Sequence, residues 1–438
     1  MTFDEAQECL RKVAIACWKN ASQVATAHST ETVDLEKALG RHLAVDVRSE
    51  IKSPPFANSA MDGFALRAGE TVDLREFQIC GVIYPGDLPP KSTPLGAAWE
   101  ITTGAALPLD CDAVVKIEDI SRIDHSSSNA SRILWLKSQA KSREFIRPAG
   151  EDYQIGSLVL RAGTQLGALH LMALASVNCS RVLVFKRPRV LLLPTGRELY
   201  QVGERGGTGQ IVNSSAVYLA ASWRQLGCDV ETLPILRDDA FQFDQILKQL
   251  LLDPPDLFVT TGAVSMGSAD FIRTGLEQNG FTIHFHRLSI RPGKPILFAE
   301  KKQAGKHFVM FGLPGNPISS VVGSRFFVEA YLRIFLGESL ASSSATASGA
   351  VSVAGDFIQN ASLEPKIERE QMVLNSDVQK PDGLRCFFRG RRAGGGVSVH
   401  AEQGSSLVRP LVESDSWVIL PETGTKISAG QKVDVQSL

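Results

Sequence analysis

The stretch VMFGLPGNPISS, residues 309–320, indicates the fold of the central part of this chain. An apolar run ends there in glycines and prolines, and small hydroxyl residues follow. Glycine permits a bend and proline fixes it, while asparagine directly before proline is typical of a helix N-cap and the first helical residue. We therefore expect a buried strand, a tight turn and a helix. The turn residues are Gly312, Pro314, Gly315, Asn316 and Pro317, and Ser319 follows in the first helical turn.

Two further apolar runs end in glycine turns, VLLLPTGREL (190–199) and LFVTTGAVSMGSADF (257–271). Such runs are typical of parallel strands buried on both faces, whose carboxyl ends meet at one edge of the sheet. Open α/β sheets bind ligands at that edge, where glycine and helix N-termini favour anions. The candidate ligand contacts are Thr195, Gly196, Thr261, Gly262 and Ser265. For the stretch 309–320 alone, a capped helix without a ligand is an equally good interpretation, whereas three such turns in one α/β unit favour a site.

The turn IRPGKP, residues 290–295, carries two cations, Arg291 and Lys294. Two positive charges near an anion site suggest that a phosphate or a similar oxyanion is neutralised there. The alternative interpretation is a solvated basic turn.

Carboxylates gather in the same region and are candidate Mg²⁺ ligands, because this ion prefers oxygen ligands. Glu198 and Asp270 follow glycine turns, and Asp239 is the third candidate. Asp238 and Asp239 could equally cap the next helix. His284 and His286 lack a third ligand at suitable spacing, so we expect structural histidines.

The composition is that of an ordinary globular protein, since 44% of the 438 residues are hydrophobic and 21% are charged. A formal net charge of −1 argues against binding to nucleic acid or to an anionic membrane. The N-terminus does not resemble a signal peptide, and the seven cysteines are scattered without a CxxC pair. We therefore expect a cytoplasmic protein.

The pattern along the chain predicts a multidomain protein that combines α/β and β structure. Residues 55–145 form a small β-rich domain, residues 187–337 a central parallel α/β domain, and residues 338–438 a C-terminal β-barrel-like domain. Residues 1–54 and 146–186 form a discontinuous linker domain, in which the second segment returns to the first.

Seven motifs follow one another in the order found in molybdopterin molybdenumtransferases. They are SPPFANSAMDGFAL (53–66), EITTGAALPLDCDAVV (100–115), FIRPAGEDYQIGSLVL (145–160), PTGREL, TTGAVSMGSADF, IRPGKP and GLPGNP. From about residue 5 to its C-terminus, the chain resembles this family, which includes bacterial MoeA proteins and the E domain of gephyrin.

The resemblance implies a homodimer whose discontinuous domain mediates dimerisation and whose α/β domain binds molybdopterin. It implies an enzyme that joins molybdate to the dithiolene of adenylylated molybdopterin and releases AMP, assisted by Mg²⁺. A molybdopterin adenylyltransferase would be the upstream donor. The active cleft of such proteins combines the α/β edge of one subunit with the β domain of the other.

The resemblance also implies roles for individual residues. Asp62 matches the acid of the SAMDG motif, Asp152 lies in the match to IRPAGED, and Lys294 is the second cation of the KPGKP motif. With Glu198 and Asp270, these three would be the catalytic residues. Thr103, Arg147, Arg389 and Ser405 would contact the substrates.

Some positions depart from the family pattern. Ala57 stands where aspartate is usual, Arg197 where an acid or amide is usual, and Ala263 where a second glycine is common. Ala57 and Arg197 are the changes most able to alter metal handling. Two alternative functions are an adenylyltransferase that activates molybdopterin with ATP, and a non-catalytic scaffold of MoeA type.

Overall fold

The structure, a computed structural model, describes residues 1–23, 30–125, 132–264, 271–303, 306–338 and 369–438. The chain divides into two compact units. The first consists of Met1–Asp46, Arg161–Leu171 and Arg181–Leu438, and the second of Val47–Leu160 and Met172–Ser180. The finer division into four domains stays a prediction. No helix in the described part of the chain has the length and apolar character needed to cross a membrane.

The elements of the described residues are as follows. The α-helices are α1 (Phe3–Gln23), α2 (Ala168–Ser176), α3 (Ser214–Gln225), α4 (Ala240–Leu250), α5 (Phe271–Gln278), α6 (Pro317–Gly323), α7 (Glu329–Phe335) and α8 (Arg409–Val412). Short 3₁₀ turns are η1 (Leu35–Lys37), η2 (Ala68–Val72) and η3 (Ile117–Asp119), and a π-helical turn, η4 (Ser324–Val328), joins α6 to α7.

The strands of the first unit are β1 (Thr30–Asp34), β12 (Arg181–Phe185), β13 (Arg189–Pro194), β14 (Leu199–Tyr200), β15 (Ile211–Val212), β16 (Asp229–Thr232), β17 (Leu257–Thr261), β18 (Thr282–Phe285), β19 (Ile290–Arg291), β20 (Leu297–Gln303), β21 (Lys306–Leu313), β22 (Glu370–Leu374), β23 (Val378–Gln379), β24 (Arg385–Ala393), β25 (Gly396–Val399), β26 (Ser416–Leu420), β27 (Lys426–Ile427) and β28 (Lys432–Ser437). Those of the second unit are β2 (Val47–Arg48), β3 (Asn58–Ser59), β4 (Gly63–Leu66), β5 (Glu76–Ile83), β6 (Ala97–Ile101), β7 (Ala113–Lys116), β8 (Ile120–His125), β9 (Arg132–Leu136), β10 (Ile146–Arg147) and β11 (Leu158–Leu160).

A six-stranded sheet forms the centre of the first unit, in the order β16-β13-β17-β21-β20-β18. The four strands β16, β13, β17 and β21 run parallel, which confirms the predicted α/β fold. Strand β20 runs antiparallel to β21, with Gln303 opposite Lys306. The sheet is therefore mixed. Strands β20 and β21 are consecutive in the chain and pair directly, so they run antiparallel.

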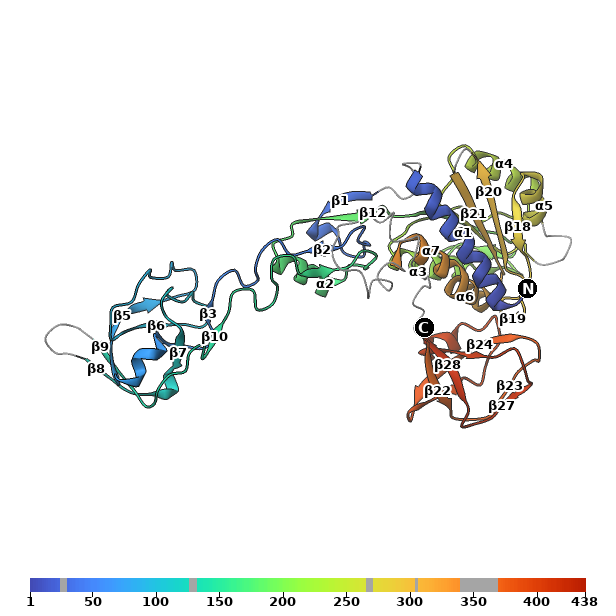
Figure 1. Ribbon diagram of the computed structural model, residues 1–438. Helices are drawn as coiled ribbons and strands as arrows, with labels where there is room; N and C mark the ends of the chain where they lie inside the picture. Colours follow the sequence, from blue (N-terminus) through green and yellow to red (C-terminus); the bar gives the residue numbers. More distant parts are fainter. Residues whose placement is uncertain (24–29, 126–131, 265–270, 304–305, 339–368) are drawn as a thin grey trace. The chain divides into compact units, whose positions relative to one another are not determined.

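Helices cover both faces of this sheet (Figure 1). Alternate residues of β13 point to opposite sides, so Leu192 packs with α1, α3, α6 and α7, whereas Leu193 packs with α4 and α5. In α1, apolar side chains at helical spacing join the first of these clusters, among them Phe3, Leu10 and Val13. The amphipathic N-terminal helix α1 is thus part of the hydrophobic core on one face of the central sheet.

The C-terminal strands close into a barrel, as predicted. Strands β24, β25, β22, β28 and β26 pair in that order, and β26 pairs again with β24. Strand β19, which forms the first two residues of the turn 290–295, pairs in parallel with β24 through Ile290 and Arg291. This pairing and a shared aromatic cluster join the barrel to the α/β sheet; Phe326 and Phe387 lie with their ring centroids 4.2 Å apart.

Two strand pairings join the segments 1–54 and 146–186, whose grouping into one domain stays a prediction. Strand β1 pairs antiparallel with β12 in the first unit, and β2 pairs antiparallel with β11 in the second.

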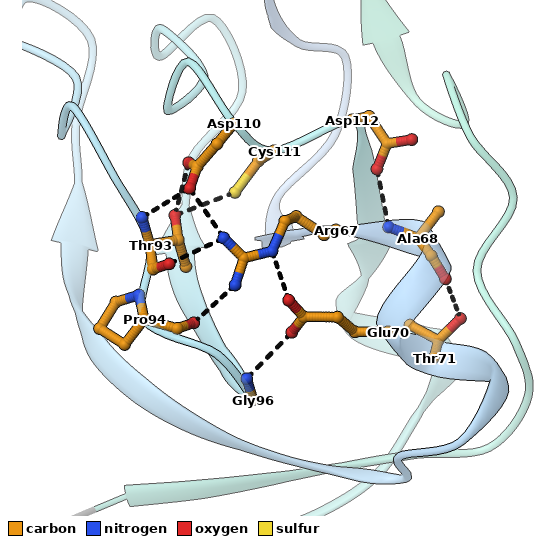
Figure 2. Close-up of polar contacts among 10 residues, drawn as sticks. All are labelled: Arg67, Ala68, Glu70, Thr71, Thr93, Pro94, Gly96, Asp110, Cys111 and Asp112. Carbon is orange, nitrogen blue, oxygen red and sulfur yellow. Dashed lines mark hydrogen bonds and ion pairs between the residues drawn. The ribbon is translucent and has the colours of Figure 1, made fainter.

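The second unit contains the small β-rich region that the sequence predicts. Its sheet has the order β7-β4-β6-β5-β9-β8, in which only β5 and β6 pair in parallel among the described strands. Figure 2 shows how the ends of these strands are fastened. The Arg67 guanidinium, directly after β4, donates to the Thr93 and Pro94 carbonyls and to Asp110. These bonds fasten the segments before β6 and β7 to the end of β4.

Candidate active site

The three glycine turns meet at one edge of the central sheet. The backbone N–H and the hydroxyl of Thr195 donate to the Thr261 carbonyl, over 2.8 and 2.9 Å. The N–H of Gly262 donates to the Leu313 carbonyl, over 2.9 Å. A Cβ atom on Gly315 would lie 3.7 Å from the Gly262 Cα atom. The expected convergence is therefore confirmed, and its cause is the parallel order of β13, β17 and β21.

Helix α6 begins at this edge as the sequence predicts. Asn316 is the N-cap residue and Pro317 the first helical residue. The Asn316 side chain makes no capping hydrogen bond with the described residues, and the residue is exposed. The Ser320 hydroxyl donates instead to the Pro314 carbonyl, and this bond ties the helix to the turn. Ser319, one position earlier, is 5% exposed.

The cation turn lies against the first turn of α6. Gly293 has a φ of +101°, and a Cβ atom there would lie 3.5 Å from the Ser319 carbonyl oxygen. Arg291 and Lys294 flank this glycine and are both exposed. Within the described ranges neither cation forms an ion pair, so both charges are available at the sheet edge.

The barrel also reaches α6. The N–H of Ile318 donates to the Ser405 carbonyl over 3.0 Å. Arg389, the other candidate from the barrel, is only 1% exposed, and its guanidinium donates to carbonyls of the loop 402–407. Burial lowers the pKa of the Arg389 guanidinium from its ordinary value. The predicted contact of Arg389 with a substrate stays a prediction, and in the structure this residue holds the loop that carries Ser405.

The candidate carboxylates lie near the end of β13, but they have different partners. Glu198 is exposed, and its carboxylate lies close to Gly196. A Cβ atom on that glycine would lie 2.6 Å from a carboxylate oxygen of Glu198. Asp239 caps α4 by accepting from two backbone N–H groups, over 2.9 and 3.0 Å, which confirms its capping role. Its role as a metal ligand stays a prediction. Asp238 lies 3.6 Å from the Arg197 guanidinium.

Asp270 and Ser265 lie outside the described residues. Among the residues that are described, no group of three or more histidine, cysteine, aspartate or glutamate side chains could hold a metal ion. The two histidines have structural contacts, as expected. His284 lies 3.2 Å from Glu300, and the Nε2 atom of His286 donates to the Val264 carbonyl over 3.0 Å.

In the second unit, the register of the sheet brings Asp62 and Thr103 together. Gly63, the first residue of β4, lies opposite Ile101, the last residue of β6. Asp62 therefore accepts from the Thr103 backbone N–H over 2.7 Å and from its hydroxyl over 2.8 Å. These two bonds lower the pKa of the Asp62 carboxyl below its ordinary value, because they stabilise its charged form.

The other two candidates of the second unit are exposed and lie near β3. Arg147 is in β10 and lies opposite Asn58. The N–H of Asp152 donates to the Ser53 carbonyl, over 3.0 Å. Neither side chain is brought to the Asp62–Thr103 pair by a hydrogen bond within the described ranges.

Sequence reasoning missed one residue that holds the candidate Arg389 in place. Gln403 makes hydrogen bonds to both the backbone and the guanidinium of Arg389. Its position two residues before Ser405 in the EQGSS stretch was the only signal in the sequence, and local spacing does not reveal a partner on another strand.

Comparisons with known proteins agree with this geometry. Three family models match: the MoeA N-terminal region (domain I and II) over residues 1–178, a probable molybdopterin binding domain over 192–334, and the MoeA C-terminal region (domain IV) over 371–438. The molybdopterin molybdenumtransferase of Synechococcus elongatus is 33% identical over 416 residues, covering 93% of this chain and 94% of the relative. That of Haemophilus influenzae is 29% identical over 423 residues, covering 95% and 96%.

Among solved structures, the molybdopterin biosynthesis MoeA protein from Pyrococcus horikosii superposes with a TM-score of 0.74 at 26% identity. The match covers 100% of this chain and 98% of the other.

Proposed function

Because this chain belongs to the molybdopterin molybdenumtransferase family, we propose that it joins molybdate to the dithiolene of adenylylated molybdopterin and releases AMP. It is an enzyme of molybdenum cofactor biosynthesis that inserts molybdenum into molybdopterin. The observation that best supports the finer proposal is the meeting of three glycine turns with the Arg291–Lys294 turn at one sheet edge.

Charge at this edge suits molybdate, a doubly negative oxyanion. Arg291 and Lys294 are exposed cations beside the first turn of α6, and cations paired with oxyanions form the stronger class of hydrogen bonds. The exposed Asn316 amide adds a neutral donor at the same turn. We assign the oxyanion to this corner between the cation turn and α6.

Cleavage of the phosphoanhydride requires the two substrates to be positioned and their charge to be cancelled. The glycines at 196, 262 and 315 leave the backbone open at the edge, where the pterin and its phosphates would bind. Asp62, whose carboxylate accepts two hydrogen bonds from Thr103, is assigned to the orientation of water in the β-rich region. Arg147, Thr103 and Asp152 are proposed to contact the substrates from the same region.

The described carboxylates would hold Mg²⁺ only together with substrate phosphates. Magnesium is usually held by one or two carboxylates together with substrate phosphates. Glu198 offers an exposed carboxylate, whereas Asp238 is close to the Arg197 cation. We propose Glu198 and Asp270 as the ligands, and the ion would neutralise phosphate charge. Arg197 then lowers the negative charge next to this site.

The assembly and location of the protein are proposals from the resemblance. We propose a homodimer formed through the discontinuous domain, where the exposed apolar side chains Leu39 (57%) and Leu169 (80%) offer surface for such a contact. Sedimentation analysis tests it. We also propose a cytoplasmic location and a molybdopterin adenylyltransferase as the source of the substrate.

One assay separates the three functions. The purified protein is mixed with adenylylated molybdopterin, Mg²⁺ and molybdate, and AMP is followed. AMP release that depends on molybdate is the expected result. Consumption of ATP with free molybdopterin would instead identify an adenylyltransferase, and neither reaction would identify a scaffold.

A further inference from the structure

The loop 402–407 of the C-terminal barrel touches the helix at which we place the oxyanion. The Ser405 carbonyl accepts the N–H of Ile318, which directly precedes Ser319 in the first turn of α6. The barrel strand β24 also pairs with β19, whose last residue is Arg291. The loop and the first helical turn are therefore joined by a direct backbone hydrogen bond.

Arg389 fastens this loop through hydrogen bonds of its guanidinium. Its guanidinium donates from Nη1 to the Leu407 carbonyl over 2.7 Å, and from Nη2 to the carbonyls of Glu402 and Gly404 over 2.9 and 3.2 Å. Its Nε–H donates to the Gln403 side chain over 3.3 Å. Four of the five N–H groups of this arginine are thus used inside the protein.

Both polar atoms of the Gln403 side-chain amide form hydrogen bonds with Arg389. Its Oε1 accepts from the Arg389 backbone N–H over 3.0 Å as well as from Nε–H. Its Nε2 donates to the carbonyls of Arg389 and His400, over 2.9 and 2.8 Å. Only a side-chain amide can accept and donate in this way, because a carboxylate has no hydrogen to donate.

We propose that Gln403 is a positioning residue for molybdate binding: it fixes Arg389 and the loop 402–407, and through Ser405 it fixes the first turn of α6. The inference deepens the proposed function and rests on it. Gln403 acts through these neighbours and does not itself touch the oxyanion.

The test uses the full-length protein and two variants of nearly unchanged size, Gln403→Glu and Gln403→Leu. Gln403→Glu keeps the acceptor and loses both donor bonds, and Gln403→Leu loses all four bonds. Gln431→Ala is the matched control, because Gln431 accepts a backbone N–H from Ser428 over 2.7 Å elsewhere in the same barrel. AMP release is measured against molybdate concentration and, separately, against adenylylated molybdopterin concentration, and Tm is recorded for each variant.

We expect both Gln403 variants to raise the KM for molybdate about ten-fold or more, as loss of a residue that supports a ligand does at metal sites. The KM for adenylylated molybdopterin should change no more than in Gln431→Ala. A KM for molybdate within two-fold of the wild type, with a lowered Tm, would overturn the proposal and leave Gln403 a structural residue only.

A calorimetric titration of molybdate alone separates this inference from the proposed function. If the wild type releases no AMP, the proposed function fails. Molybdate binding that is present in the wild type and lost in Gln403→Glu would still support the inference. Equal binding by both proteins, or binding by neither, would overturn it.

Discussion

A Cβ atom on Gly262 would lie 2.5 Å from the carbonyl oxygen of Thr195, so two of the three glycine turns are in direct contact. Gly262 also has a φ of +86°, a conformation that favours glycine. The close approach follows from the pairing of Pro194 with Thr261 at the ends of β13 and β17. The turn that binds the substrate in our proposal therefore depends on the absence of a single side chain.

Gly262→Ala should destabilise the protein strongly, because the new methyl group meets backbone and because the residue stays in a left-handed conformation. We expect a loss of roughly 2–4 kcal/mol from these two causes. Gly209→Ala is the control, since Gly209 has a φ of +84° and open space around it. It should lose only about 1 kcal/mol. Thermal unfolding compares the two, and equal shifts in Tm would contradict the contact.

Thr103→Val should raise the pKa of the Asp62 carboxyl, because the hydroxyl that donates to it is lost while the backbone N–H remains. The acid limb of the pH–rate profile should then move to higher pH. Thr103→Ser, which keeps the hydroxyl, should leave it in place. The titration of Asp62 by NMR checks the direction, and a pKa that is the same in Thr103→Val and the wild type would remove the hydroxyl from this role.

We predict that the protein loses stability at acid pH because the Glu300 carboxylate becomes protonated there. Burial acts to raise the pKa of this carboxyl, but contacts with His284 and His307 outweigh it and lower the pKa to about 2. Because the pKa is depressed in the folded state, the stabilisation is present above the unfolded value near 4.5 and is lost as the pH falls towards 2. It amounts to on the order of 3 kcal/mol.

Glu300→Gln should therefore lower the free energy of unfolding at pH 7 and flatten its dependence on pH between 4.5 and 2. Urea unfolding at several pH values measures both effects. Glu413→Gln is a control, because Glu413 contacts His400 at an exposed position. A dependence on pH that is as steep in Glu300→Gln as in the wild type would show that Glu300 contributes nothing to it.

Glu198→Gln should raise the Mg²⁺ concentration needed for half-maximal AMP release by on the order of ten-fold, because a proposed ligand loses its charge while its size is kept. Removal of the metal with a chelator should stop AMP release, and added Mg²⁺ should restore it. Arg197→Gln should shift the requirement in the opposite direction, since it removes a cation 3.6 Å from Asp238. The same Mg²⁺ dependence in all three proteins would exclude a metal site beside Glu198.

Local patterns in the sequence predicted the parts of the fold that local chemistry determines. The apolar runs ending at Gly196, Gly262 and Gly315 predicted three parallel strands with adjacent turns, because such runs and turns are encoded within a few residues. The antiparallel course of β20 was not predicted, because direction depends on which neighbour a strand pairs with.

The candidate site was predictable to the same extent. Pro317 at the start of α6 and the exposed cation Lys294 follow from their own motifs. The burial of Arg389 and its hydrogen bonds with Gln403 were not predicted. These bonds join β24 to a loop residue fourteen positions further along the chain. Contacts of this kind depend on the closed barrel and leave no local periodic signal.

The most direct test of the account is a single-turnover reaction with adenylylated molybdopterin in which AMP and pterin-bound molybdenum are measured together. We predict that AMP appears only when molybdate is present and that one molybdenum is bound for each AMP released. AMP release at the same rate without molybdate, or with no molybdenum in the pterin product, would contradict it.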